Sequence, residues 1–151
     1  MIAVIALGLL AMLVCLAFQV LTSVLAARYF AHASRKPLGP KPLRGIFLQF
    51  SILMAVLMIG NIVQVAFWAV LYRLVGAFAD FETAMYFSGV TFTSLGYGDV
   101  LLTGRMRLLG PLQAANGLMM FGITTALFIS VIQQTTAKWI AAQSAGTQNV
   151  R

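Results

Sequence analysis

The sequence DFETAMYFSGVTFTSLGYGD occupies residues 80–99 and contains an uncharged run at 83–98. This run has 16 residues and is rich in Ser, Thr and Gly. A helix that crosses a bilayer needs about 20 mostly apolar residues, so the run is too short and too polar to cross. Non-helical backbone at membrane depth is tolerated only where protein buries it or where it lines a watery cavity. We therefore predict a re-entrant segment, which is typical of a pore or a transport site.

Three longer uncharged runs, 1–27, 45–72 and 108–137, are apolar enough to cross a bilayer. The chain is 61% hydrophobic and 9% charged, whereas a soluble domain is nearer half apolar and a quarter charged. The predicted fold class is an all-α membrane protein with three transmembrane helices and one re-entrant helix. The first run carries no arginine before Arg28, which excludes a voltage sensor there.

The charged residues predict the orientation of these helices. Five of the ten bases lie within 28–44, and Lys138 and Arg151 follow the last span. Because basic loops stay in the cytoplasm, we expect 28–44 and the C-terminus to be cytoplasmic and the N-terminus to be outside. All three acids then face outward. The compact size and short tails favour a prokaryotic inner (plasma) membrane.

The first part of the quoted stretch predicts a short helix over 81–92. Asp80 is a suitable N-cap, and Glu82 favours the positive N-terminal end of a helix. Twelve residues at 1.5 Å each span about 18 Å, roughly half a bilayer. Such a helix enters from outside and stops near the midplane. Its C-terminal end, with a partial negative charge, then stabilises a cation in the middle of the membrane.

The residues that follow, Thr93 to Asp99, suit the binding of a dehydrated cation. Neutral carbonyl oxygens replace water without the tight trapping that a carboxylate causes. Gly96 and Gly98 allow the left-handed conformations that aim successive carbonyls in one direction. Ser94 adds a hydroxyl oxygen at the inner end, and Tyr97 is placed to turn away from the axis and brace the segment against the short helix.

The sequence Thr93-Ser94-Leu95-Gly96-Tyr97-Gly98-Asp99 resembles the selectivity-filter signature of potassium channels, usually written Thr-Thr-Val-Gly-Tyr-Gly-Asp. The resemblance covers an outer helix, a pore helix, a filter and an inner helix. It implies a homotetramer that conducts K⁺ passively and selectively, with K⁺ itself as the only bound metal and no cofactor. The expected partners are other copies of the chain and membrane lipids.

The resemblance also implies roles for individual residues. K⁺ is expected on the oxygens of five filter residues: Ser94, Leu95, Gly96, Tyr97 and Gly98. Filter support and the outer mouth are assigned to Thr93, Asp99, Tyr86 and Phe87. The segments implied are an accessory helix at 1–27, a basic loop at 28–44, a pore module at 45–137 and a tail at 138–151.

Several positions depart from the family pattern, and three of them concern the filter and its support. Ser94 replaces the usual threonine, Leu95 replaces valine, and Phe87 lacks the hydrogen-bond donor that family aromatics often carry there. A weaker brace on Tyr97 leaves a weakly selective cation channel open as an alternative. A potassium-transporter subunit and a non-conducting membrane accessory or scaffold subunit also remain open.

Polar and small residues in the outer and inner spans suggest further roles. Gly117 and Gly122 are candidate gating hinges, although small residues also let helices pack closely. Asn61 and Gln64 share one helical face and are expected to bond across helices. In contrast, Trp68 and Tyr72 near the outer end are expected to be interfacial anchors.

Several function classes lack the residues that they need. We find no pair of carboxylates, no Ser/His/Asp set and no phosphate-binding loop, so we assign no catalytic residues and no small-molecule substrate. The single Cys15 excludes an intramolecular disulfide framework, and the single His32 leaves little for a metal cluster. The net charge of +7 does not indicate nucleic acid, because membrane topology accounts for the bases.

Overall fold

The computed structural model describes residues 1–33 and 42–148. Within these residues the fold is all-α, and three of the helices are long and apolar enough to cross a membrane. This confirms the predicted fold class. The elements, in chain order, are α1 (Ile2–Ala33), α2 (Pro42–Leu74), α3 (Phe81–Phe92), a 3₁₀ helix (Gly104–Leu108) and α4 (Leu109–Gln148).

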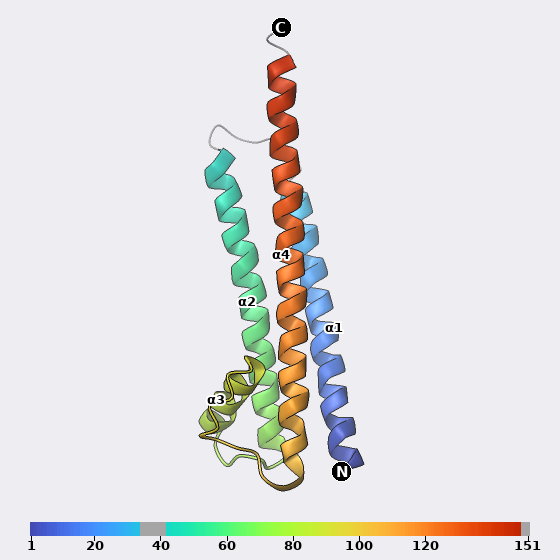
Figure 1. The fold of residues 1–151 in the computed structure, drawn as a ribbon, viewed down its shortest axis with the longest axis vertical. Helices are drawn as coiled ribbons and strands as arrows, with labels where there is room; N and C mark the ends of the chain where they lie inside the picture. Colours follow the sequence, from blue (N-terminus) through green and yellow to red (C-terminus); the bar gives the residue numbers. More distant parts are fainter. Residues whose placement is uncertain (34–41, 149–151) are drawn as a thin grey trace.

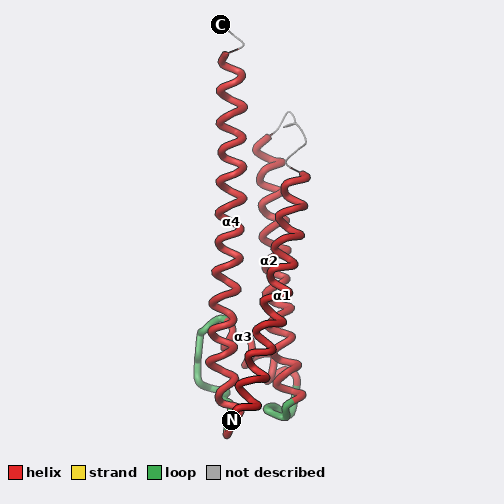
Figure 2. The backbone as a smooth tube through the Cα atoms, turned by 90° about the vertical axis from the view of Figure 1, so that its right-hand side faces the viewer, coloured by secondary structure: helices red, strands yellow, loops and turns green. Residues whose placement is uncertain are grey.

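The three long helices lie side by side, and the short α3 is set against one end of the bundle (Figure 1). The N-terminus, the end of α2 and the start of α4 all lie at this end. The other ends of α1 and α2 and the C-terminus point the opposite way. After α3 the chain returns as an irregular segment to the end where α4 begins (Figure 2). α3 and the following segment thus enter and leave at one end of the bundle, as predicted for a re-entrant segment.

Local signals fix the ends of α2 and the start of α3. Pro42 is the first residue of α2, where the missing N–H of proline costs nothing. α2 ends in a Schellman motif, in which Gly76 has a φ of 71° and Ala77 N–H donates to the Tyr72 carbonyl at 2.9 Å. The predicted N-cap of α3 is confirmed, because Asp80 accepts a hydrogen bond of 2.7 Å from the backbone N–H of Thr83.

α1 is longer than the uncharged run that predicts it. The helix continues through Arg28 to Ala33, and His32 lies in its last turn. No glycine or proline interrupts 28–33, and basic side chains favour the negative C-terminal end of a helix. Much of the expected 28–44 loop, including Pro37, Gly39 and Pro40, lies outside the described residues.

The largest buried side chains gather between α3 and the three long helices. Tyr72 packs edge-on against Phe87, with ring centroids 5.2 Å apart. The expectation that Trp68 and Tyr72 anchor the chain at the membrane interface is wrong, because both side chains are fully buried. α3 and its loop cover this end of α2, and the Tyr72 hydroxyl finds its partner inside the protein rather than in headgroups.

We predict that the cap of α3 contributes measurably to stability. Asp80→Ala should lower the free energy of unfolding by about 0.5–2 kcal/mol, because the Thr83 N–H loses its acceptor. Thermal unfolding of the purified protein measures this change. Asp80→Asn, which keeps a side-chain oxygen at the cap, is the control, and an equal loss in both variants would contradict a capping role.

Candidate functional site

The candidate site begins where α3 ends. Leu95 N–H donates to the Val90 carbonyl and Ser94 N–H donates to the Thr91 carbonyl, both at 3.0 Å. This pattern is a complete Schellman motif, with Ser94 at the left-handed position that glycine usually occupies. The φ of Ser94 is 59°, and a left-handed conformation costs a residue with a Cβ about 1–2 kcal/mol. Serine is unbranched at Cβ, so it tolerates this position better than threonine does.

Left-handed residues alternate along the segment. Ser94, Gly96 and Gly98 have φ values of 59°, 61° and 81°, whereas Leu95 and Tyr97 between them do not have positive φ. The left-handed conformation expected of Gly96 and Gly98 is therefore confirmed, and Ser94 extends the alternation by one position. Alternating handedness reverses the usual flip of successive peptide groups, so it favours carbonyls that share a direction. All side chains from Thr93 to Asp99 are exposed in the single chain.

A hydrogen bond links α3 to the end of this segment. The Tyr86 hydroxyl donates to Oδ2 of Asp99 over 2.6 Å. Both groups are exposed, and the bond holds the pKa of the Asp99 carboxyl below its usual value. The segment from Ser94 to Gly98 is thus held at both ends, by the Schellman motif at its start and by Tyr86 at its end.

Thr93 and Phe87, both assigned to filter support, face α3 and α2. The Thr93 hydroxyl donates to the Gly89 carbonyl at 2.7 Å, so it bonds to the last turn of α3. The Phe87 ring is buried against Tyr72 and Phe78, with ring centroids 5.2 and 5.1 Å away. Phe87 therefore positions α3 against α2 and the loop that follows it.

A buried polar chain joins α2, α3 and α4. The Tyr72 hydroxyl donates to Oε1 of Gln113 at 2.6 Å, and Nε2 of Gln113 donates to Oγ of Ser88 at 2.6 Å and to its carbonyl at 3.1 Å. The Ser88 hydroxyl in turn donates to the Val65 carbonyl at 2.7 Å. Tyr72, Ser88 and Gln113 are all fully buried. Both the amide N–H groups and the carbonyl oxygen of the Gln113 side chain have hydrogen-bond partners. These bonds fix the rotation and position of α3 against α2 and α4.

The C-terminal end of α3 packs directly against Gly117 of α4, a contact that we call the Gly117 seat. A Cβ at this position would overlap the Phe92 carbonyl oxygen and lie 2.8 Å from its carbonyl carbon. One turn further along α4, the ring of Phe121 packs edge-on against the ring of Phe92, with centroids 5.6 Å apart. Gly117 lies eight residues into α4, which is about 12 Å along the helix. This distance along α4 is close to half the thickness of a hydrocarbon core of roughly 30 Å.

A known protein family matches the part of the chain that forms these helices and the loop. The model of a family described as an ion channel matches residues 52–134, more than half of the chain. This chain is a member of that ion-channel family. The matched residues run from α2 through α3 and the irregular segment into α4. No curated protein and no solved structure gives a significant match.

In this ion channel α1 lies outside the matched residues, yet it is tied to the matched helices. Gln64 Nε2 donates to Oε1 of Gln19 at 2.7 Å, and Gln19 Nε2 donates to the Thr124 hydroxyl at 3.1 Å. The cross-helix bond expected of Gln64 is confirmed, while Oδ1 of Asn61 is buried without a partner. A methyl at Gly8 would lie 2.5 Å from Leu112 Cδ1, so α1 also packs closely on α4.

The roles of Ser88 and Gln113 and the left-handed conformation of Ser94 are not predicted from the sequence. Gln113 offered a signal, because it lies four residues before Gly117 and therefore shares its helical face. Ser94 offered another, because it stands at the position after the last turn of a predicted helix. The hinge roles of Gly117 and Gly122 stay predictions. α4 is continuous through both, and Gly122 is exposed with open space around it.

We predict opposite outcomes for two alanine substitutions in α4. Gly117→Ala should destabilise the channel by about 1–3 kcal/mol, because the new methyl group displaces the end of α3. Gly122→Ala should be neutral or slightly stabilising, since it meets no atom and alanine favours helices. Thermal unfolding of both variants checks this, and a tolerated Gly117→Ala would show that α3 does not rest on α4 there.

The buried polar chain predicts a non-additive pair of mutations. Gln113→Leu should cost about 1–3 kcal/mol, because it leaves the Tyr72 hydroxyl buried without an acceptor. Adding Tyr72→Phe should recover part of that loss, since an apolar pair buries no orphaned group. A double-mutant cycle on unfolding midpoints measures the coupling, and strictly additive effects would mean that the two side chains do not act together.

Proposed function

We propose that this protein is a potassium-selective channel in which four identical chains surround one pore. One observation carries the proposal: the alternation of left-handed residues at Ser94, Gly96 and Gly98, directly after a half-length helix. This backbone suits rings of carbonyl oxygens that replace the hydration shell of K⁺. The ligands are the carbonyls of residues 94–98 together with the Ser94 hydroxyl.

The geometry around α3 supports cation binding at the inner end of the filter. The C-terminal end of α3 carries a partial negative charge and lies at the start of residues 94–98. The seat at Gly117 holds this end about 12 Å along α4, within the bundle. A cation that has lost water there is compensated by the helix dipole as well as by the carbonyls.

The exposed filter supports assembly from several copies. One chain contributes a single filter segment, and its side chains from Thr93 to Asp99 are uncovered. A single segment lines one side of a pore, so a closed ring needs further copies. A homotetramer, with lipid around it, completes the ring that the family signature implies. No cofactor and no catalytic residue is needed for this passive function.

We assign the filter end of the bundle to the outside. All three acids lie at the start of α3 or at the end of the filter, at Asp80, Glu82 and Asp99, while Arg28 lies in the last turns of α1 and Arg44 in the first turn of α2. This arrangement satisfies the positive-inside bias, and the outer acids concentrate cations near the mouth. Gly117 and Gly122 are the proposed hinge positions of the inner helix.

Ion flux into liposomes that contain the purified protein tests this function. Potassium and sodium gradients are compared, with barium as the blocker. The proposal predicts potassium-selective flux that barium stops. Equal potassium and sodium fluxes would instead identify a weakly selective cation channel, and absence of flux with an intact tetramer would favour a non-conducting subunit.

We predict that flux depends on Gly96 but not on a second glycine of the same conformation. Gly96→Ala should abolish potassium flux while the helices stay folded, because a Cβ disfavours a φ of 61°. Gly104→Ala is the matched control, since Gly104 has a φ of 56° and open space but lies outside the filter. Flux through both variants and their circular dichroism are measured, and unchanged flux in Gly96→Ala would refute the filter assignment.

A further inference from the structure

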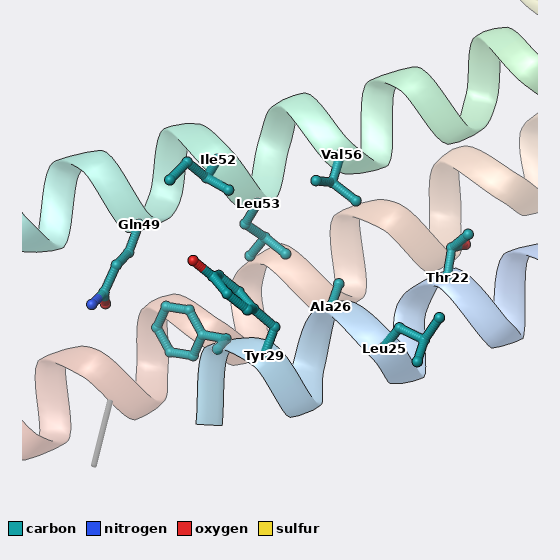
Figure 3. Close-up of a pocket in the computed structure, with 9 residues that line it drawn as sticks. Thr22, Leu25, Ala26, Tyr29, Gln49, Ile52, Leu53 and Val56 are labelled. Carbon is teal, nitrogen blue, oxygen red and sulfur yellow. The ribbon is translucent and has the colours of Figure 1, made fainter. Parts of the chain in front are cut away.

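A cavity of about 230 Å³ opens between α1 and α2, at the end of the bundle away from the filter (Figure 3). We refer to it as the α1–α2 groove. Its walls are almost entirely apolar and include Leu25 of α1 and Ile52 and Val56 of α2. Leu25 is 56% exposed and Val56 is 44% exposed in the single chain. The groove is therefore open on the outer surface of the single chain.

The polarity of the groove changes along its length. Leu25 and Val56 form an apolar inner part, and the hydroxyl of Tyr29 and the amide of Gln49 lie nearer the end of α1 and the start of α2 (Figure 3). Two exposed bases lie near this end without lining the groove: Arg28, next to Tyr29 in α1, and Arg44, five residues before Gln49 in α2. Along α2, from its first turn inward, the order is thus cationic, polar and apolar.

We propose that the α1–α2 groove binds one acyl chain of an anionic phospholipid, whose phosphate group is held by Arg28 and Arg44. The order of the groove matches the lipid, in which a phosphate, then ester groups, then a hydrocarbon tail follow one another. From Thr22 to Tyr29 the groove runs about 10 Å along α1. That length covers about two-thirds of the hydrocarbon depth of one leaflet, which is roughly 15 Å.

Charge complementarity favours a lipid over a helix of a second chain. Basic residues next to the bilayer are attracted to anionic headgroups, and two exposed bases, Arg28 and Arg44, lie within a few residues of the groove lining. A packed second helix covers such bases only if it brings acids, and the three acids of this chain lie at the start of α3 and at the end of the filter. The lipid, in contrast, supplies both the tail and the negative charge.

The floor of the groove belongs to a core that includes the inner helix. Ala26 and Leu53 line the groove and also pack in a buried cluster with Val131 of α4. Phe50 of the same cluster contacts Phe128 of α4, with ring centroids 5.8 Å apart. A lipid tail in the groove therefore contacts side chains that pack against α4. The inference rests on the membrane-spanning fold and not on ion selectivity.

Photolabelling of the full-length protein in vesicles locates the lipid. The probe is a phosphatidylglycerol that carries a diazirine on its acyl chain, diluted into phosphatidylcholine. We expect the label on peptides that contain residues 22–30 and 49–56. Val56→Phe should remove most of this label because the larger side chain fills the groove. Val63→Phe, seven residues along the same face of α2 and 46% exposed, should leave the label unchanged.

A second measurement tests the charge. Arg28→Gln together with Arg44→Gln should abolish the preference of the groove for phosphatidylglycerol over a phosphatidylcholine probe with the same diazirine. Arg73→Gln, at the filter end, should keep that preference. The proposal is overturned if wild-type peptides 22–30 and 49–56 are not labelled, or if the preference survives loss of both arginines. It is also overturned if Tyr29→Cys cross-links efficiently to a second chain, which would identify a subunit contact. None of these readouts requires ion flux, so the lipid site and the channel function fail separately.

Discussion

The contact between the Phe92 carbonyl and Gly117 sets the position of everything that follows in the chain. A half-length helix has no membrane-crossing length to fix its depth, so a neighbour must do it. Here α4 presents a position without a side chain, and the backbone end of α3 rests in that space. Because the contact is between backbones, it leaves little freedom to tilt or slide. The left-handed turn at Ser94 and the start of the filter inherit this position.

Polar bonds reinforce the seat where apolar packing alone would not. Helix association inside a membrane gains little from the hydrophobic effect, because lipid tails are as apolar as leucine. The Tyr72–Gln113–Ser88 chain therefore supplies specific contacts between α2, α3 and α4. A second series of hydrogen bonds, Gln64–Gln19–Thr124, joins α1 to α2 and α4 of the same polypeptide. α1 is thus part of the packed unit even though the family match begins within α2.

The sequence predicts those features that depend on local chemistry. The bounds of α3, its Asp80 cap, the three apolar helices and the left-handed Gly96 and Gly98 all follow from residue type and spacing. The misses depend on neighbours far along the chain. Burial of Trp68 and Tyr72 requires α3 to fold back over α2, and the partner of Gln113 comes from another helix. The length of α1 beyond Arg28 was missed because a charge ends a hydrophobic run without ending a helix.

A cryo-electron microscopy map of the full-length protein, purified in potassium, tests the central claim most directly. The account predicts four chains around one axis, with residues 94–98 facing that axis and ion density between their carbonyl layers. It also predicts that each Phe92 carbonyl rests on Gly117 of its own chain. A map in which residues 94–98 face lipid, or in which the end of α3 is separated from Gly117, would contradict the account.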